Sequence, residues 1–311
     1  MNFDIETVIK NNEQNVPSIL FTYGKEINLF NKSANMSIDT NEIINNINSN
    51  ENEQNNIIIL DSSFNPPTLA HIKLLIETFK FYCEQMLSNR NNANQCFHYT
   101  FLLLITNNNV DKKIIGASLS QRLKMMEIVT NIFQNHIMEI VNDSFKEIKY
   151  KLNKINILVG LTNVGRFIDK VTAVKRYIPN SLLAFIMGWD TITRFFMKKY
   201  YVGIDMKEVL DSFFKESAII CADRIMYNEN TNISERKENG ELNYFLTEGP
   251  AKSYSNKIYI LNNWLNDKII CKVSSSEARN ILKENYNNQD MLKTILSKEI
   301  LDFIVHNNIY N

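Results

Sequence analysis

The sequence predicts an α/β protein with a Rossmann-like, open and mostly parallel sheet flanked by helices. Two observations carry this prediction. Short apolar runs that suit buried parallel strands recur along the chain, and each of the first four is followed by a segment with helical spacing of its apolar residues. Strands and helices that alternate in this way are typical of a parallel sheet. In such a sheet, ligands bind beyond the carboxyl ends of the strands.

The expected strands are short apolar runs, as strands covered on both faces require. They lie at 57–60, 99–106, 155–161, 182–187 and 218–222, and the runs at 257–261 and 269–273 are candidates for two more. The loops after the first four strands are therefore where a site is expected.

The expected helices show apolar residues three and four positions apart, so each buries one face. The first begins after a Ser/Asn/Pro turn, where Asn65 suits the N-cap and Pro66 suits the first helical position. The helices cover 69–79, 119–133, 164–177, a segment from near Asp190, 274–282 and 291–305.

The chain of 311 residues is long enough to bury a large core. We predict an Asn-rich, partly irregular N-terminal extension at 1–56 and one domain at 57–311. A polar insertion near 228–252 interrupts that domain and is expected to be exposed.

Composition excludes several classes of protein. The 34 Lys and Arg residues balance 34 Asp and Glu residues, so a polybasic surface for nucleic acid or anionic membrane is not expected. No apolar run is long enough to span a membrane, and the N-terminus shows no secretory signal. The four Cys residues form no C-x-x-C pair, so neither a zinc site nor a disulfide framework is indicated. We expect a cytoplasmic or nuclear protein with no protein-held metal.

The loop after the first strand reads S-S-F-N-P-P-T-L-A-H over residues 62–71. At the start of a helix, Thr68 and His71 share one face, three residues apart. The free N–H groups of the first helical turn point to the same place and attract anions. Alone, T-x-x-H is more often a capped helix with a surface His; within this string, at the first strand–helix turn, it favours a phosphate site.

The second string reads V-S-S-S-E-A-R over residues 273–279. Ser274 and Glu277 have the spacing of a capping box, which predicts a helix start. The hydroxyls of Ser275 and Ser276 and the guanidinium of Arg279 can bind phosphate oxygens. An ordinary capped helix with an exposed Arg is the structural alternative.

These strings carry a family resemblance. Residues 63–71 resemble the S-F-N-P-x-T-x-x-H signature of nicotinamide/nicotinate mononucleotide adenylyltransferases, a variant of the H/T-x-G-H motif of the nucleotidylyltransferase superfamily. Residues 273–279 resemble the I-S-S-T-x-x-R motif of the same enzymes, and M-G-W-D at 187–190 resembles their G-x-D segment. The D-K-K run at 111–113, with Arg122 further on, is similar to their basic loop and following helix. The resemblance runs from about 57 to 282 and is closest to the divergent fungal branch.

The chain departs from the family pattern at three points. Ser62 stands where the family usually has Gly, a position at which the backbone approaches the ligand closely. Ala70 replaces the Gly of the H/T-x-G-H form. Neither Trp189, inside the G-x-D segment, nor Trp264 matches the family's Trp contacts to the pyridine ring.

The resemblance implies the nucleotidylyltransferase fold and adenylyl transfer from ATP to nicotinamide or nicotinate mononucleotide. The products are NAD, or its deamido form, and pyrophosphate, formed by direct in-line attack. It makes His71 and Thr68 catalytic and assigns Lys112 or Lys113 to the substrate phosphate. It assigns ATP binding to Ser63, Phe64, Asn65, Gly188, Asp190, Ser274, Ser275, Ser276 and Arg279. Mg²⁺ is expected, held mainly by the ATP phosphates.

Two alternatives stay open. One is a nucleotidylyltransferase of the same fold with a different acceptor or with CTP. The other is an ATP-binding or ATP-hydrolysing regulatory protein that keeps the ATP site and lacks the acceptor site. The sequence does not give the oligomeric state.

Overall fold

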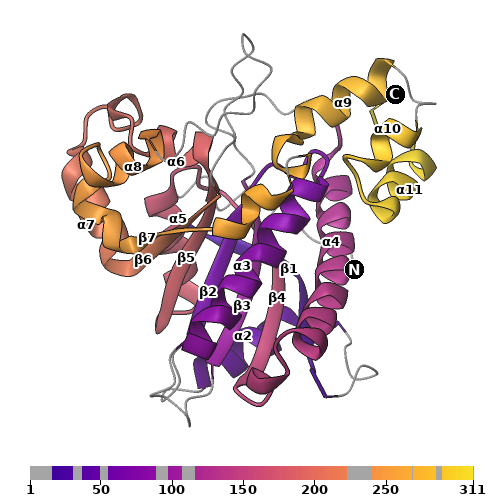
Figure 1. Ribbon diagram of the computed structural model, residues 1–311, viewed down its shortest axis with the longest axis horizontal. Coiled ribbons are helices and arrows are strands. Elements are labelled where there is room, and N and C mark those ends of the chain that lie inside the picture. The colour runs from indigo at the N-terminus through magenta and orange to yellow at the C-terminus, as the bar shows by residue number, and fades with distance from the viewer. Residues whose placement is uncertain are drawn as a thin grey trace.

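The computed structural model describes residues 16–30, 37–49, 55–88, 97–106, 116–222, 240–267, 269–284 and 289–310. Within these residues, seven strands form one sheet in the order β1-β4-β3-β2-β5-β6-β7. Neighbouring strands run parallel except β1, which pairs antiparallel with β4. Helices flank the sheet, and the predicted α/β fold is confirmed (Figure 1).

The strands in chain order are β1 (Ile19–Ile27), β2 (Asn55–Asp61), β3 (Phe97–Thr106), β4 (Leu152–Thr162), β5 (Ser181–Gly188), β6 (Ser217–Ala222) and β7 (Ile258–Ile260). The first five predicted runs lie within β2 to β6, and the run at 257–261 contains β7. The run at 269–273 was wrongly predicted as a strand, because it forms the 3₁₀ turn η7 (Ile270–Lys272). Ile269 is 69% exposed there, whereas a strand inside this sheet would be buried.

The α-helices are α2 (Thr40–Ser49), α3 (Leu69–Ser88), α4 (Leu119–Asp143), α5 (Phe167–Tyr177), α6 (Trp189–Phe195), α7 (Met206–Glu216), α8 (Gly240–Thr247), α9 (Ser275–Glu284), α10 (Gln289–Lys293) and α11 (Lys298–His306). Further 3₁₀ turns are η3 (Lys146–Ile148), η4 (Lys198–Tyr200), η5 (Lys252–Lys257) and η6 (Asn262–Asn266). The segment 291–305 holds the end of α10 and most of α11 rather than one helix. The chain breaks there because Ser297 caps α11, its Oγ accepting a hydrogen bond from the N–H of Ile300.

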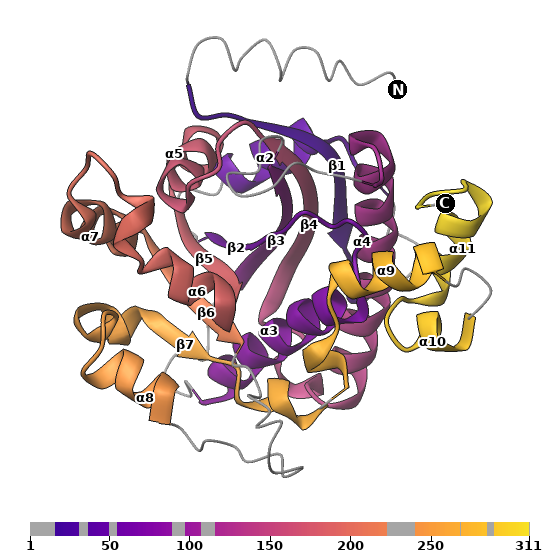
Figure 2. The ribbon, with the colours of Figure 1, turned by 90° about the horizontal axis from the view of Figure 1, so that it is seen from above.

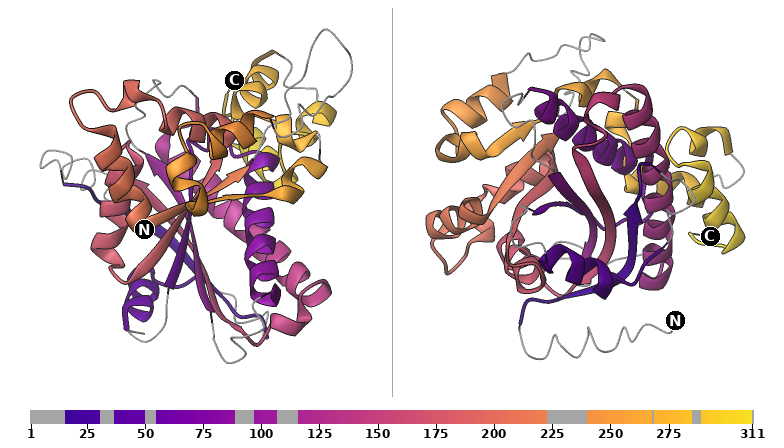
Figure 3. Two further views of the ribbon diagram at one scale, coloured as in Figure 1. Left: turned by 60° about the vertical axis from the view of Figure 1, so that its left-hand side comes forward. Right: turned by 90° about the horizontal axis from the view of Figure 1, so that it is seen from below.

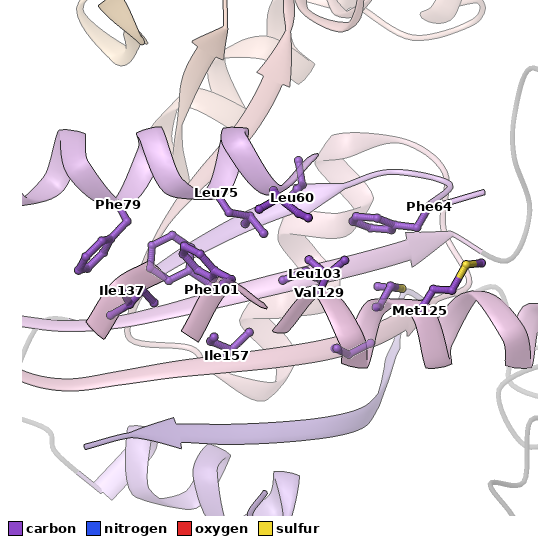
Figure 4. Packing of buried hydrophobic residues seen from close by; sticks show 14 of the residues in the cluster. Leu60, Phe64, Leu75, Phe79, Phe101, Leu103, Met125, Val129, Ile137 and Ile157 are labelled. Atoms are coloured by element: carbon purple, nitrogen blue, oxygen red, sulfur yellow. The ribbon is translucent and has the colours of Figure 1, made fainter. Parts of the chain in front are cut away.

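The sheet buries both of its faces, which explains why its strands are continuously apolar. Ile58 and Leu60 of β2 pack with α3, α4 and the C-terminal helices, whereas Ile57 and Ile59 pack with α2, α5, α6, α7 and α8. In the first of these cores, large side chains of α3 and α4 meet across β3 (Figure 4). Phe101 lies 4.9 Å from Phe133, ring centre to ring centre, in an edge-to-face contact.

The described part of the N-terminal segment is built into the sheet. β1 forms the sheet edge beside β4, and α2 packs against β1 (Figure 3). β1 and α2 are therefore built onto the same sheet as the strands of the predicted domain at 57–311. Of the predicted insertion, residues 228–239 lie outside the described residues. In its remainder, residues 240–252, α8 buries Phe245 against the core, while most of the other described side chains are exposed. None of the described helices has the length and apolar character that crossing a bilayer requires.

Candidate active site

The strand order places a crevice at the carboxyl end of β2. In the sheet, β3 and β4 lie on one side of β2, and β5, β6 and β7 lie on its other side. The connections after β2 and β5 therefore leave toward opposite faces, and ligands bind at such a switch point in open α/β sheets. Seen from above, α9 crosses this edge of the molecule near the start of α3 (Figure 2).

The loop after β2 has an unusual backbone. Phe64 has φ of 44°, in the left-handed region that bulky residues rarely adopt, and its side chain is fully buried. The peptide between Asn65 and Pro66 is cis. A bulky residue such as Phe64 persists in the left-handed region only where its surroundings hold it, and such residues gather at functional sites.

Asn65 does not cap the helix, contrary to the sequence prediction. Its Oδ1 accepts hydrogen bonds from the N–H of Ala117 at 3.2 Å and from the hydroxyl of Tyr310 at 2.7 Å. The helix begins at Leu69 instead, with the carbonyl of Thr68 accepting from the N–H of His71. The Asn65 side chain therefore ties the loop to the segment before α4 and to the C-terminal end of the chain.

Three backbone carbonyls of this loop accept hydrogen bonds from distant helices. Arg122 of α4 donates to the carbonyl of Ser63 at 3.2 Å, and Arg279 of α9 donates to that of Asn65 at 2.6 Å. The Ser275 hydroxyl donates to the carbonyl of Pro66 at 2.8 Å. The two motifs predicted from sequence, which are more than 200 residues apart in the chain, thus form one structure.

His71 lies within this structure and is partly buried. Its Nδ1 accepts a hydrogen bond from the N–H of Thr68 at 3.1 Å and lies 2.9 Å from the Thr68 hydroxyl. Its Nε2 lies 2.9 Å from the hydroxyl of Ser62, and its ring packs against Phe64 at 5.1 Å between centres. Burial lowers the pKa of His71 to about 4, so the imidazole is neutral near pH 7.

Thr68 lies directly against His71. Its side chain is fully buried, and its hydroxyl reaches the His71 ring rather than the open edge of the sheet. The hydroxyl of Thr68 is thus placed to orient the His71 ring, and its predicted role in catalysis stays a prediction. The side chains of Phe64 and Asn65 are also buried, so these residues shape the loop.

The start of α9 agrees with the predicted helix start. The Oγ of Ser274 accepts a hydrogen bond from the N–H of Glu277 at 3.1 Å. Arg279 also donates to the hydroxyl of Ser276 at 3.1 Å. Among the described residues, neither Arg279 nor Arg122 forms an ion pair with a carboxylate, and Nε of the buried Arg122 has no hydrogen-bond partner. The charge on these two guanidinium groups is thus left to attract an anion.

The space beside the end of β5, at Gly188, is not filled by atoms of the residues that the structure describes. A Cβ atom built on Gly188 would meet no atom within 4 Å, so the protein's own packing does not require glycine there. Asp190 is exposed at the first turn of α6. Lys112 and Lys113 lie outside the described residues, and their predicted role stays a prediction.

A second hollow, with a volume of about 360 Å³, opens beside the ends of β4 and β5. Its lining includes Phe167, Tyr200 and Tyr201 and the basic residues Arg194, Lys199 and Arg166, the last of which pairs with Asp169. Aromatic faces beside positive charge suit a planar, phosphorylated ligand.

Sequence reasoning missed three residues at this edge of the sheet. Lys170 of α5, whose side chain is only 2% exposed, forms an ion pair with Asp61 at 2.5 Å, and Thr106 donates to the other oxygen of Asp61 at 3.3 Å. Asp61 could have been recognised as a candidate site residue, because it is a charged residue directly after an apolar strand. Nothing in the sequence marks Lys170 as buried. Tyr310 was missed because its partner Asn65 is 245 residues away.

No protein-family model matches the chain. Among curated proteins, it is similar to the "Putative nicotinamide mononucleotide adenylyltransferase" of Schizosaccharomyces pombe (strain 972), with 25% identity over 248 residues, covering 80% of this chain and 83% of the relative. The predicted family resemblance is confirmed. Residues 63–71 and 273–279, the two strings on which that resemblance is based, meet around the Asn65 carbonyl.

Solved structures with a similar fold include two of nicotinic acid mononucleotide adenylyltransferase from Plasmodium falciparum. The complex with NaAD has a TM-score of 0.47 at 23% identity, and the complex with APC has 0.45 at 21%; each comparison covers 83% of this chain and 98% of the other. A putative nicotinate-nucleotide adenylyltransferase from Vibrio parahaemolyticus has a TM-score of 0.39 at 12% identity, covering 81% of this chain and 93% of the other.

Proposed function

We propose that this protein is a nucleotidyltransferase that transfers the adenylyl group of ATP to nicotinamide or nicotinate mononucleotide. The observation that carries the proposal is the contact between the two motifs: Arg279 and Ser275 of α9 hold the carbonyls of Asn65 and Pro66 in the loop after β2. Two helix starts, two arginines and a neutral histidine then face one edge of the sheet. These are the donors that a triphosphate requires.

In the reaction, an oxygen of the acceptor's 5′-phosphate attacks the α-phosphorus of ATP in line. The new bond joins that oxygen to the α-phosphorus. The bond from the α-phosphorus to the bridging oxygen breaks, and pyrophosphate leaves with the electron pair. The products are NAD, or its deamido form, and pyrophosphate. The protein contributes by holding the reactants in line and by stabilising negative charge.

We assign the following roles to the chain. His71 acts on the α-phosphate side of the site, with its Nε2 against the Ser62 hydroxyl, and Thr68 holds its ring. Ser276, Arg279 and the first N–H groups of α9 bind the leaving β- and γ-phosphates, with the positive charge of Arg122 behind the loop. Asp190 meets a ribose hydroxyl, and Lys112 or Lys113 neutralises the incoming phosphate.

Mg²⁺ would be carried by oxygens of the triphosphate, since this ion commonly binds substrate phosphates and water rather than an all-protein cage. Bound there, it would neutralise charge on the leaving pyrophosphate. The described residues contain no group of three His, Cys, Asp or Glu side chains able to hold an ion by themselves. We expect chelation by EDTA to stop turnover while leaving the fold intact.

The second hollow supports an aromatic, phosphorylated acceptor. The aromatic residues Phe167, Tyr200 and Tyr201 are in its lining, and so are the basic residues Arg194 and Lys199. Because no Trp lines it, a different acceptor, or CTP in place of ATP, remains a second candidate for the same chemistry.

The proposal is tested by an end-point assay with ATP, Mg²⁺ and either mononucleotide. NAD is measured through a coupled dehydrogenase, and the deamido product by chromatography. We expect product from the wild type and on the order of a hundredfold less from His71→Ala. His306→Ala, which removes an exposed imidazole, is the matched control and should leave activity unchanged.

Three outcomes would count against the proposal. ATP consumption without dinucleotide would favour the regulatory ATPase alternative. Product with CTP rather than ATP would favour a different nucleotide donor. Equal activity of His71→Ala and wild type would remove the assigned role of the histidine.

A further inference from the structure

Ser62, the residue where the chain departs from the family's usual glycine, occupies a defined place at the site. It follows the last residue of β2, and its N–H donates to the carbonyl of Leu104 in β3 at 3.2 Å. The sheet therefore fixes its backbone. Its side chain is partly exposed, and its hydroxyl oxygen lies 2.9 Å from Nε2 of His71.

The partners of His71 fix the direction of this hydrogen bond. A backbone N–H can only donate, so Nδ1 of His71 accepts from Thr68 and carries no proton. In the neutral imidazole the proton is then on Nε2. Nε2–H therefore donates to the Ser62 oxygen.

A hydroxyl that accepts one hydrogen bond is polarised to donate another. In the part of the chain that the structure describes, the Ser62 hydroxyl contacts only His71, so its proton is available. The side chain lies beyond the carboxyl end of β2, where the strand order creates the crevice. The series of hydrogen bonds from Thr68 through His71 to Ser62 thus ends in the Ser62 hydroxyl, which can donate to a ligand.

We propose that Ser62 is a catalytic residue whose hydroxyl donates a hydrogen bond to a non-bridging oxygen of the transferred α-phosphate, with His71 acting through it. No proton is transferred: the hydrogen bond strengthens as charge grows on that oxygen and weakens when pyrophosphate has left. This inference rests on the proposed adenylyl transfer. It turns a departure from the family pattern into a replacement donor.

The test compares three substitutions at Ser62 by steady-state kinetics. Ser62→Ala keeps the Cβ but removes the hydroxyl, and should lower kcat about 10- to 100-fold with little change in the KM for ATP, because the lost bond forms mainly in the transition state. Ser62→Thr keeps the hydroxyl and should retain most of the activity. Ser62→Gly lets the imidazole approach the phosphate directly, and should fall between Ala and wild type.

A double-mutant comparison separates a shared role from two independent ones. If His71 acts through Ser62, Ser62→Ala combined with His71→Ala should lose no more activity than His71→Ala alone. Ser255→Ala, at an exposed hydroxyl on η5, is the control with unchanged kinetics. Thermal unfolding should show that the Ser62 variants fold.

Two results would overturn the inference while dinucleotide formation by the wild type stands. One is Ser62→Ala with wild-type kcat. The other is Ser62→Gly faster than wild type, because the side chain would then only obstruct the ligand. Absence of dinucleotide with the wild-type protein would instead refute the proposed function, so the two failures are distinguishable.

Discussion

The ion pair between Asp61 and Lys170 should stabilise the end of β2 strongly. Removal of Asp61 and removal of Lys170 should lower the free energy of unfolding by different amounts. Lys170 has a side chain only 2% exposed, whereas that of Asp61 is 15% exposed and also accepts from Thr106. Removing the acid leaves a buried ammonium group whose other described neighbour is the ring of Phe167, 5.0 Å from Nζ. Removing the lysine leaves a carboxylate with some access to water.

Breaking a buried pair by removing one partner typically costs 3–5 kcal/mol. For Asp61→Asn we expect about 3 kcal/mol, because the one amide oxygen can still accept from Lys170 while the amide NH2 replaces the oxygen that accepts from Thr106. For Lys170→Met we expect about 1–2 kcal/mol, since the apolar chain refills the space and Asp61 retains Thr106 and water. The double variant should be more stable than the sum of the two losses predicts.

Urea unfolding of the full chain measures these differences. Asp290→Asn removes the acid of an exposed pair with Lys293, in which the Asp side chain is 97% exposed, and should leave the unfolding curve unchanged. The reasoning is refuted if Asp61→Asn lies within about 0.5 kcal/mol of wild type or if Lys170→Met costs more than Asp61→Asn.

Three further predictions concern the site. Burial lowers the pKa of His71 from 6.5 to about 4, so between these pH values the folded protein binds fewer protons than the unfolded chain. The free energy of unfolding should therefore fall by at most about 3 kcal/mol as the pH drops from 6.5 toward 4. His71→Gln should remove this part of the pH dependence of urea unfolding. Tyr310→Phe removes the buried hydrogen bond to Asn65. It should lower the free energy of unfolding by about 1 kcal/mol and raise the KM for ATP. If neither quantity changes, Tyr310 does not position Asn65 for the site. Arg279→Lys keeps the charge, but the lysine cannot reach both the Asn65 carbonyl and the Ser276 hydroxyl. The KM for ATP should therefore rise about tenfold in steady-state kinetics. A KM equal to that of the wild type would show that the guanidinium group is not needed.

Local patterns predicted the sheet and the main helices because each depends on residues close in the chain. The run at 57–60 is apolar because both faces of β2 are covered, and Thr68 meets His71 because they are three residues apart at a helix start. The N-cap was misplaced at Asn65 for the opposite reason. Its side chain is used by Ala117 and Tyr310, which no local pattern can reveal.

Assembly of the loop after β2 and the phosphate binding that we propose for it have the same physical origin. Arg122 and Arg279 donate to backbone carbonyls, which satisfy hydrogen bonds but cancel no charge, and the described residues offer them no carboxylate. The loop keeps its left-handed residue Phe64 because these groups hold it, and the charge that holds it is available to a triphosphate. Bound ATP should therefore relieve the repulsion between the two arginines and stabilise the loop, the helices that clamp it and the C-terminal end together. Protection by ATP in thermal unfolding should be smaller in Arg279→Lys than in wild type, since a ligand at a given concentration stabilises a fold more the more tightly it binds.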